Sequence, residues 1–139
     1  MESSKRPWWI LLSISGASAV ALGAFAAHGL EGVLTSRDWE PALVEKRLGQ
    51  FETSTRYHLA HSVVLLALAV GVSPQRFRIA STLFVLGIIF FCGSLYLLVL
   101  TNQTWLGAIT PVGGLCWIVA WVLLAFAGRP AMRAESHDE

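Results

Sequence analysis

The longest apolar pattern in the chain covers residues 79–128, a stretch that contains no Asp, Glu, Lys or Arg. A helix needs about 20 mainly apolar residues to cross a hydrocarbon core of about 30 Å. Residues 79–100 and 106–127 each reach that length, and the polar turn 101–104 between them is too short for anything but an antiparallel pair. The pattern therefore predicts two membrane spans joined as a hairpin.

Two further spans are predicted upstream, at residues 8–28 and 57–73. The first resembles a secretory signal with a cleavage site at Ala24-Phe25-Ala26, but it is long for a signal core. It also carries small residues every four positions, which favour close helix contacts within or between molecules: Ser15, Ala19, Gly23 and Ala27. The second is the weakest span because its apolar run is short.

Residues 39–56 form the most strongly patterned polar stretch. Apolar or small side chains recur there at three- and four-residue spacing (Val44, Leu48, Phe51 and Thr55), and charged residues occupy most other positions. This pattern predicts an amphipathic helix. Three placements follow: the helix lies on the membrane surface, it caps the bundle, or it is a solvated extension of the next span.

The composition agrees with these elements. Hydrophobic residues make up 55% of the 139 residues and charged residues 14%, with a net charge of +1. We predict one all-α domain over residues 1–139, an integral membrane four-helix bundle with an amphipathic segment between its first two spans. The low net charge argues against nucleic acid as a partner.

The placement of lysine and arginine predicts the orientation. Most bases fall on one side of a four-span bundle: Lys5, Arg6, Arg76, Arg78, Arg129 and Arg133. Both termini are therefore expected in the cytoplasm of a cell-membrane protein, which would lie in the inner membrane of a Gram-negative source.

Glycines suggest where the last two spans touch. Gly93 lies about seven residues from the turn 101–104, and Gly113 and Gly114 lie at a matching depth in the last span. We expect Gly93 to face one of them. Thr110-Pro111 predicts either an N-cap and first position of a helix that begins there, or a proline kink in a longer helix.

Polar residues of all four spans are predicted to form one layer near the outer boundary. They are His28, Tyr57, His58, His61, Ser94, Tyr96, Asn102 and Thr110. Such a layer is typical of a pocket for a small molecule, lipid, haem or metal, or of hydrogen bonds between helices. Trp117 and Trp121 are expected to face lipid or an interface.

The sequence contains no residue pattern typical of an enzyme. No charged residue lies inside a span, which argues against a transporter that needs an intramembrane acid. Cys92 and Cys116 lie in spans without metal-ligand spacing. We therefore expect no enzymatic activity, no cofactor and no metal site.

Four motifs occur in a fixed order: residues 23–29 (GAFAAHG), Tyr57-x-x-x-His61, residues 91–96 (FCGSLY) and residues 110–114 (TPVGG). In this order they resemble the domain of unknown function 423 family, small multi-pass membrane proteins related to transmembrane protein 256. The resemblance spans residues 8–128 and implies no reaction. The chain departs from the usual pattern at Ala26, Cys92 and His58, where Gly, Ser and Gln are common.

The leading hypothesis is therefore a non-enzymatic membrane protein that acts through helix packing with itself, with a partner protein or with lipid. Ligand binding in the polar layer is one alternative, through His28, Tyr57, His61, Ser94, Tyr96 and Thr110. A haem or metal protein is the other. Gly23, Gly93, Pro111, Gly113 and Gly114 are expected to serve packing.

Overall fold

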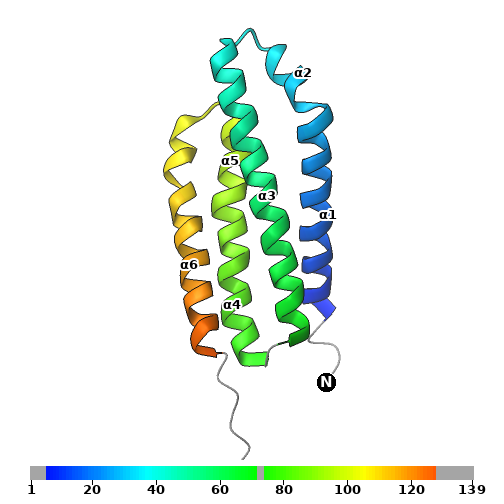
Figure 1. Ribbon diagram of the computed structural model, residues 1–139, viewed down its shortest axis with the longest axis vertical. Helices are drawn as coiled ribbons and strands as arrows, with labels where there is room; N and C mark the ends of the chain where they lie inside the picture. The colour runs from blue at the N-terminus through cyan, green and yellow to red at the C-terminus, as the bar shows by residue number, and fades with distance from the viewer. Residues whose placement is uncertain (1–5, 72–73, 128–139) are drawn as a thin grey trace, which may run out of the picture.

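The computed structural model describes residues 6–71 and 74–127. Helical segments stack into four long rods that lie side by side (Figure 1). In chain order the segments are α1 (Arg6–His28), α2 (Leu30–Thr35), α3 (Pro41–Gly71), α4 (Pro74–Gly87), the π-helix η1 (Ile88–Gly93), α5 (Ser94–Thr101), the 3₁₀-helix η2 (Thr104–Ala108) and α6 (Thr110–Ala127). Basic residues 5, 129 and 133, used above for the orientation, lie outside the described residues.

The described part of the chain is all-helical, and its surface is that of a membrane protein. Three stretches are long and apolar enough to cross a membrane: Trp8–His28, Arg78–Thr101 and Thr104–Phe126. Large apolar side chains such as Val70 and Phe126 are largely uncovered, as expected where lipid replaces water as the solvent. The start of α1 and the end of α6 lie at the same end of the bundle (Figure 1).

The amphipathic stretch and the predicted second span are one continuous helix. α3 has 31 residues, which corresponds to about 46 Å. It packs against α1, α4, η1 and α5, so its lower half lies beside the apolar helices. Among the three placements that the sequence left open, the structure has a helical extension of the predicted span, but one face of it is packed rather than solvated, since Val44 and Phe51 are buried. The predicted boundary near residue 57 does not exist as a break in the helix.

A short helix that the pattern did not predict closes the upper end. α2 lies above α1 (Figure 1), and its Leu30 and Leu34 are fully buried. They belong to an upper core with Val44, Phe51, Leu98, Val99 and Leu106. This apolar cap anchors the polar half of α3 to the spans beneath it.

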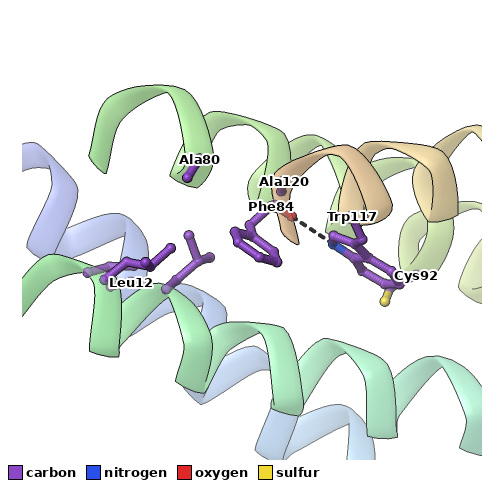
Figure 2. Packing of buried hydrophobic residues seen from close by; sticks show 8 residues of the cluster. Leu12, Ala80, Phe84, Cys92, Trp117 and Ala120 are labelled. Atoms are coloured by element: carbon purple, nitrogen blue, oxygen red, sulfur yellow. Dashed lines mark hydrogen bonds between the residues drawn. The ribbon is translucent and has the colours of Figure 1, made fainter. Parts of the chain in front are cut away.

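A second, lower core joins all four rods. It consists of Leu12, Leu65, Leu68, Ala80, Phe84, Cys92, Trp117 and Ala120. Figure 2 shows the Phe84 ring pointing from α4 toward α3, and the Trp117 indole reaching in from α6. The indole Nε1 donates a hydrogen bond of 3.1 Å to the Phe84 carbonyl. Trp117 is therefore a core residue at the interface between helices, so of the two predicted positions, facing lipid or facing an interface, it has the second; Trp121 is exposed.

The last α-helix begins at Thr110. The preceding residues 104–108 form a 3₁₀-helix, and Pro111 stands at the second position of α6. A proline is tolerated in the first turn because its missing N–H would have no partner inside the helix. The structure therefore has a separate helix start at this point rather than a kink in one long helix.

The close contact between the last two rods differs from the predicted one. A Cβ placed on Gly113 would lie 2.3 Å from the Phe91 backbone nitrogen and 2.9 Å from the Gly87 carbonyl oxygen. A Cβ on Gly93 would meet nothing within 4 Å. The partner of Gly113 is thus the segment from Gly87 to Phe91, about one turn below the predicted partner Gly93.

Candidate functional site

A chain of hydrogen bonds crosses the bundle at His58 of α3. Its Nδ1 lies 3.3 Å from the Tyr96 hydroxyl of α5, and its Nε2 lies 3.4 Å from the Ser15 hydroxyl of α1. Ser15 also bonds Ser62 at 2.7 Å, and Ser62 donates to the His58 carbonyl. Three helices are therefore linked by polar side chains that partner one another, an arrangement that holds membrane helices together.

Two further hydroxyl bonds join the rod made of α4, η1 and α5 to the helices on either side of it. The Ser54 hydroxyl of α3 donates to the Cys92 carbonyl of the π-helix at 3.0 Å. On the other side, the Ser94 and Thr110 hydroxyls lie 2.8 Å apart. Two of the predicted ligand-binding residues thus bond each other, and Thr110 uses its hydroxyl for this contact between helices.

Aromatic rings of α3, α4, η1 and α6 form a cluster beside this network. It consists of Tyr57, His61, Phe84, Phe91, Trp117 and Trp121. The Trp117 indole stacks on His61 with ring centroids 3.7 Å apart and planes within 5°. The same indole lies parallel to Tyr57 at 5.6 Å. Through these ring contacts Trp117 links α6 to α3, and it also lies beside α4 and η1.

Two arginines meet the upper end of α5. Arg47 is 3% exposed, and its Nε and Nη2 both donate to Oδ1 of Asn102. Its Nη1 donates to Gln50. Arg37 donates to the Leu100 carbonyl. Because the last carbonyls of a helix carry partial negative charge, cations are favoured at this end.

Arg47 lies above the predicted second span and has neutral hydrogen-bond acceptors. Burial lowers the pKa of its guanidinium, but an arginine side chain remains charged in proteins. Asn102 adopts a left-handed conformation, φ 58°, which places its side chain at the helix end as a capping residue. Arg47 and Asn102 therefore hold the upper part of α3 against the end of α5.

The structure divides the predicted polar layer into separate groups. Tyr57 and His61 lie in the aromatic cluster, Tyr96 lies beside His58, and Ser94 pairs with Thr110. His28 is exposed at the end of α1, away from the other predicted site residues. Ser15 lies seven residues after Trp8 and thirteen before His28, which corresponds to about 10 Å and about 20 Å along α1. The network therefore extends deep into the bundle, which corrects its placement in one layer near the outer boundary.

Arg47, Trp117 and the buried serines Ser54 and Ser62 are interior residues that the sequence did not predict. Arg47 is three residues after Val44 and four before Phe51, both buried. That spacing places it on the inner face of the helix, and this was the available signal. Trp117 is four residues after Gly113, which marks the face of α6 that meets its neighbour.

The chemical capacity of these groups is limited by their mutual bonding. Within residues 6–71 and 74–127, no three His, Cys, Asp or Glu side chains lie close enough together to hold a metal ion. In the same ranges, each side-chain N or O atom sealed from solvent has a hydrogen-bond partner. The described interior polar groups are thus bonded to one another or to the backbone. Nε2 of His61 is an exception.

The chain matches the family described as protein of unknown function (DUF423) over residues 22–114. It is 39% identical over 120 residues to a UPF0382 membrane protein of Staphylococcus aureus, covering 85% of this chain and 91% of that one. The UPF0382 membrane protein YwdK of Bacillus subtilis is 37% identical over 124 residues, with 85% and 92% covered.

A UPF0382 membrane protein of Haemophilus influenzae is 34% identical over 124 residues, with 88% of this chain and 93% of that one covered. No solved structure matches the chain significantly. The names of these relatives describe membrane proteins and no reaction. On the extent of these matches, and on the helical membrane fold described above, the chain belongs to the DUF423 family, whose relatives here carry the name UPF0382 membrane protein.

Proposed function

We propose that this chain is a non-enzymatic membrane protein that acts by lateral helix packing, and that its first partner is a second copy of itself. The observation that carries the proposal is the unequal covering of the spans. Only 11% of the most apolar window of α1 is buried, compared with 17% in the Thr104–Phe126 span and 39% in the Arg78–Thr101 span. The helix stands at the edge of the bundle (Figure 1) and packs mainly against α3.

The two faces of α1 divide the small residues between them. Ser15 bonds α3 and Ala19 is buried, so part of the predicted stripe serves the internal contact. Gly23 is half-buried, and a Cβ on it would meet nothing within 4 Å. A second row is exposed, with members at three- or four-residue spacing: Ser13, Ala17, Ala21 and Ala24. Small residues let membrane helices approach closely, which supports this row as the contact with another molecule.

The absence of catalysis is part of the proposal. Apart from Nε2 of His61, the interior hydroxyl and imidazole groups described above are hydrogen-bonded to one another or to backbone carbonyls. Catalysis by a serine or cysteine needs a nucleophile, a base and a place for the reacting atom. The Ser15–His58 pair has bonds to Ser62 and Tyr96 in the positions where a substrate and an orienting acid would act. These contacts favour a structural role.

Cysteine cross-linking in native membranes tests this contact. In a background where Cys92 is Ser and Cys116 is Ala, a cysteine is introduced at Ala17 or Ala21. The control places it at Val63, which is exposed on α3. The proposal predicts disulfide-linked dimers for Ala17→Cys and Ala21→Cys, and monomers for Val63→Cys. Monomers at all three positions, or equal cross-linking at all three, would contradict it.

We also propose an orientation of the protein in the membrane. The start of α1, the end of α3, the start of α4 and the end of α6 lie at one end of the bundle (Figure 1). Arg6, Arg76 and Arg78 belong to this end, and an excess of bases favours the cytoplasm. Both termini are thus expected in the cytoplasm. A fluorescent or phosphatase reporter at each terminus tests this, and a phosphatase-active fusion at either one would overturn it.

A further inference from the structure

The bonding of His61 differs from that of the other buried histidine. His58 has a side-chain partner at each ring nitrogen. His61 uses Nδ1, which lies 2.7 Å from the Tyr57 carbonyl oxygen. A carbonyl can only accept, so Nδ1 carries the hydrogen. In the neutral ring Nε2 is then an acceptor with a lone pair, and no described residue donates to it.

The Nε2 atom is also accessible. His61 is 8% exposed, and each side-chain N or O atom sealed from solvent in the described ranges has a partner. Because Nε2 has no partner, it must be one of the atoms that are not sealed from solvent. The flat side of the ring is covered by Trp117 at 3.7 Å, so an approaching group meets the ring in its own plane, at Nε2.

The surroundings restrict what can approach. His61 neighbours the rings of Tyr57, Phe84 and Trp117. Tyr57 is 46% exposed on the outside of the bundle. On the same side of α3, one and two turns further along, Ala60 is exposed and Val64 is partly buried, so the surface that runs from Tyr57 into the predicted span is apolar. A molecule reaching Nε2 from outside must be soluble in the bilayer and must carry a hydrogen-bond donor.

We propose that the Nε2 edge of His61, together with the exposed ring of Tyr57, is a binding site for a hydroxyl-bearing apolar molecule dissolved in the bilayer. The hydroxyl donates to Nε2, and the apolar body lies against the Tyr57 ring. This satisfies a buried acceptor that would otherwise face hydrocarbon, a state that costs free energy. The site does not depend on self-association through α1, which lies on the other side of α3 (Figure 1).

A pair of photoreactive probes tests the site on the unaltered protein. One is a long-chain alcohol with a diazirine in its chain, and the other is its methyl ether, which lacks the donor. Both are added to the full chain in lipid nanodiscs and irradiated, and the adducts are mapped by mass spectrometry. The alcohol is expected to label the region around Tyr57 about five- to tenfold more than the ether, the ratio for one hydrogen bond. Equal labelling by the two probes would overturn the proposal.

Two variants locate the acceptor. His61→Asn retains a donor near the position of Nδ1 and removes Nε2, so its labelling by the alcohol should fall to the level of the ether. His61→Gln places an amide oxygen within reach of the Nε2 position and should recover part of the preference. His58→Gln is the matched control and should label like the unaltered protein. Unchanged labelling of a folded His61→Asn protein would contradict the assignment of Nε2. Should that variant fail to fold, the alcohol-to-ether ratio of the unaltered protein decides.

Discussion

The Trp117 indole lies directly against the backbone of Gly87. A Cβ placed on Gly87 would lie 2.1 Å from the indole Nε1 and 2.3 Å from Cδ1. On the other side, the indole stacks on His61 at 3.7 Å. One aromatic side chain of α6 is therefore held between a glycine of α4 and a histidine of α3. This layer joins three helices without any charged residue.

The layer makes Gly87 sensitive to a single methyl group. Gly87→Ala should lower the free energy of unfolding by about 2 kcal/mol or more, because the indole must leave its stack and its bond to Phe84. Unfolding by SDS in mixed micelles, followed by tryptophan fluorescence, measures this. Gly93→Ala is the control and should be neutral or stabilising, since its Cβ meets nothing within 4 Å. Equal effects of the two changes would show that the layer is not packed as described.

Two adjacent glycines of α6 should behave differently. A Cβ on Gly113 would enter the Phe91 backbone at 2.3 Å, whereas one on Gly114 would lie 3.9 Å from the Phe91 ring. Gly113→Ala should therefore cost about 3 kcal/mol or prevent folding, because a helix backbone cannot yield as a side chain does. Gly114→Ala should fold normally. The fraction of monodisperse protein in size-exclusion chromatography compares them, and the reverse order would place the contact on the wrong glycine.

Asn102 should support Arg47 through its carbonyl oxygen. Asn102→Gly keeps the left-handed backbone but leaves Nε and Nη2 of a buried guanidinium without their acceptor, which should cost about 2 kcal/mol of unfolding free energy. Asn102→Asp retains an acceptor and should be at least as stable as the unaltered protein. Thermal unfolding in one detergent compares the three proteins. A glycine variant as stable as the original would mean that Arg47 does not rely on this contact.

The Ser94–Thr110 bond predicts a measurable coupling. Ser94→Ala and Thr110→Val each remove one hydroxyl of a 2.8 Å pair. In a double-mutant cycle their coupling energy should be about 0.6 kcal/mol, typical of hydrogen bonds between membrane helices. Additive effects would instead mean that the two hydroxyls act separately. Ser81→Ala combined with Thr110→Val serves as the cycle for a distant pair.

The sequence was informative where apolar length decides the structure. The uncharged stretch 79–128 predicted the antiparallel hairpin. Thr110-Pro111 allowed either a helix start or a kink, and the structure has the helix start, where a proline fits without losing a bond. Whether the amphipathic stretch 39–56 was separate from the next span stayed open in the sequence, because a change from polar to apolar surroundings does not by itself interrupt a helix whose backbone bonds continue; the structure has one helix, α3. The short helix α2 was not predicted because its two buried leucines pack against helices that are distant in the sequence.

The site was harder to predict because small offsets along a helix decide which groups meet. The polar residues were identified, but their depth was inferred from the ends of the spans, and α3 is longer than its apolar part. His61 and Trp117 lie 56 positions apart in the sequence, so no local pattern predicts that their rings stack. Arg47 was placed on the polar face by its charge, although its spacing from Val44 and Phe51 matched the buried face.

Native mass spectrometry of the protein released gently from lipid nanodiscs tests the central claim most directly. The chain has a mass of 15.1 kDa. Self-association through α1 predicts a main species at twice this mass or a higher multiple. Replacing Ala17 and Ala21 by leucine should shift it to the monomer, because larger side chains keep the helices apart. A single-chain species for the unaltered protein under the same conditions would contradict the account.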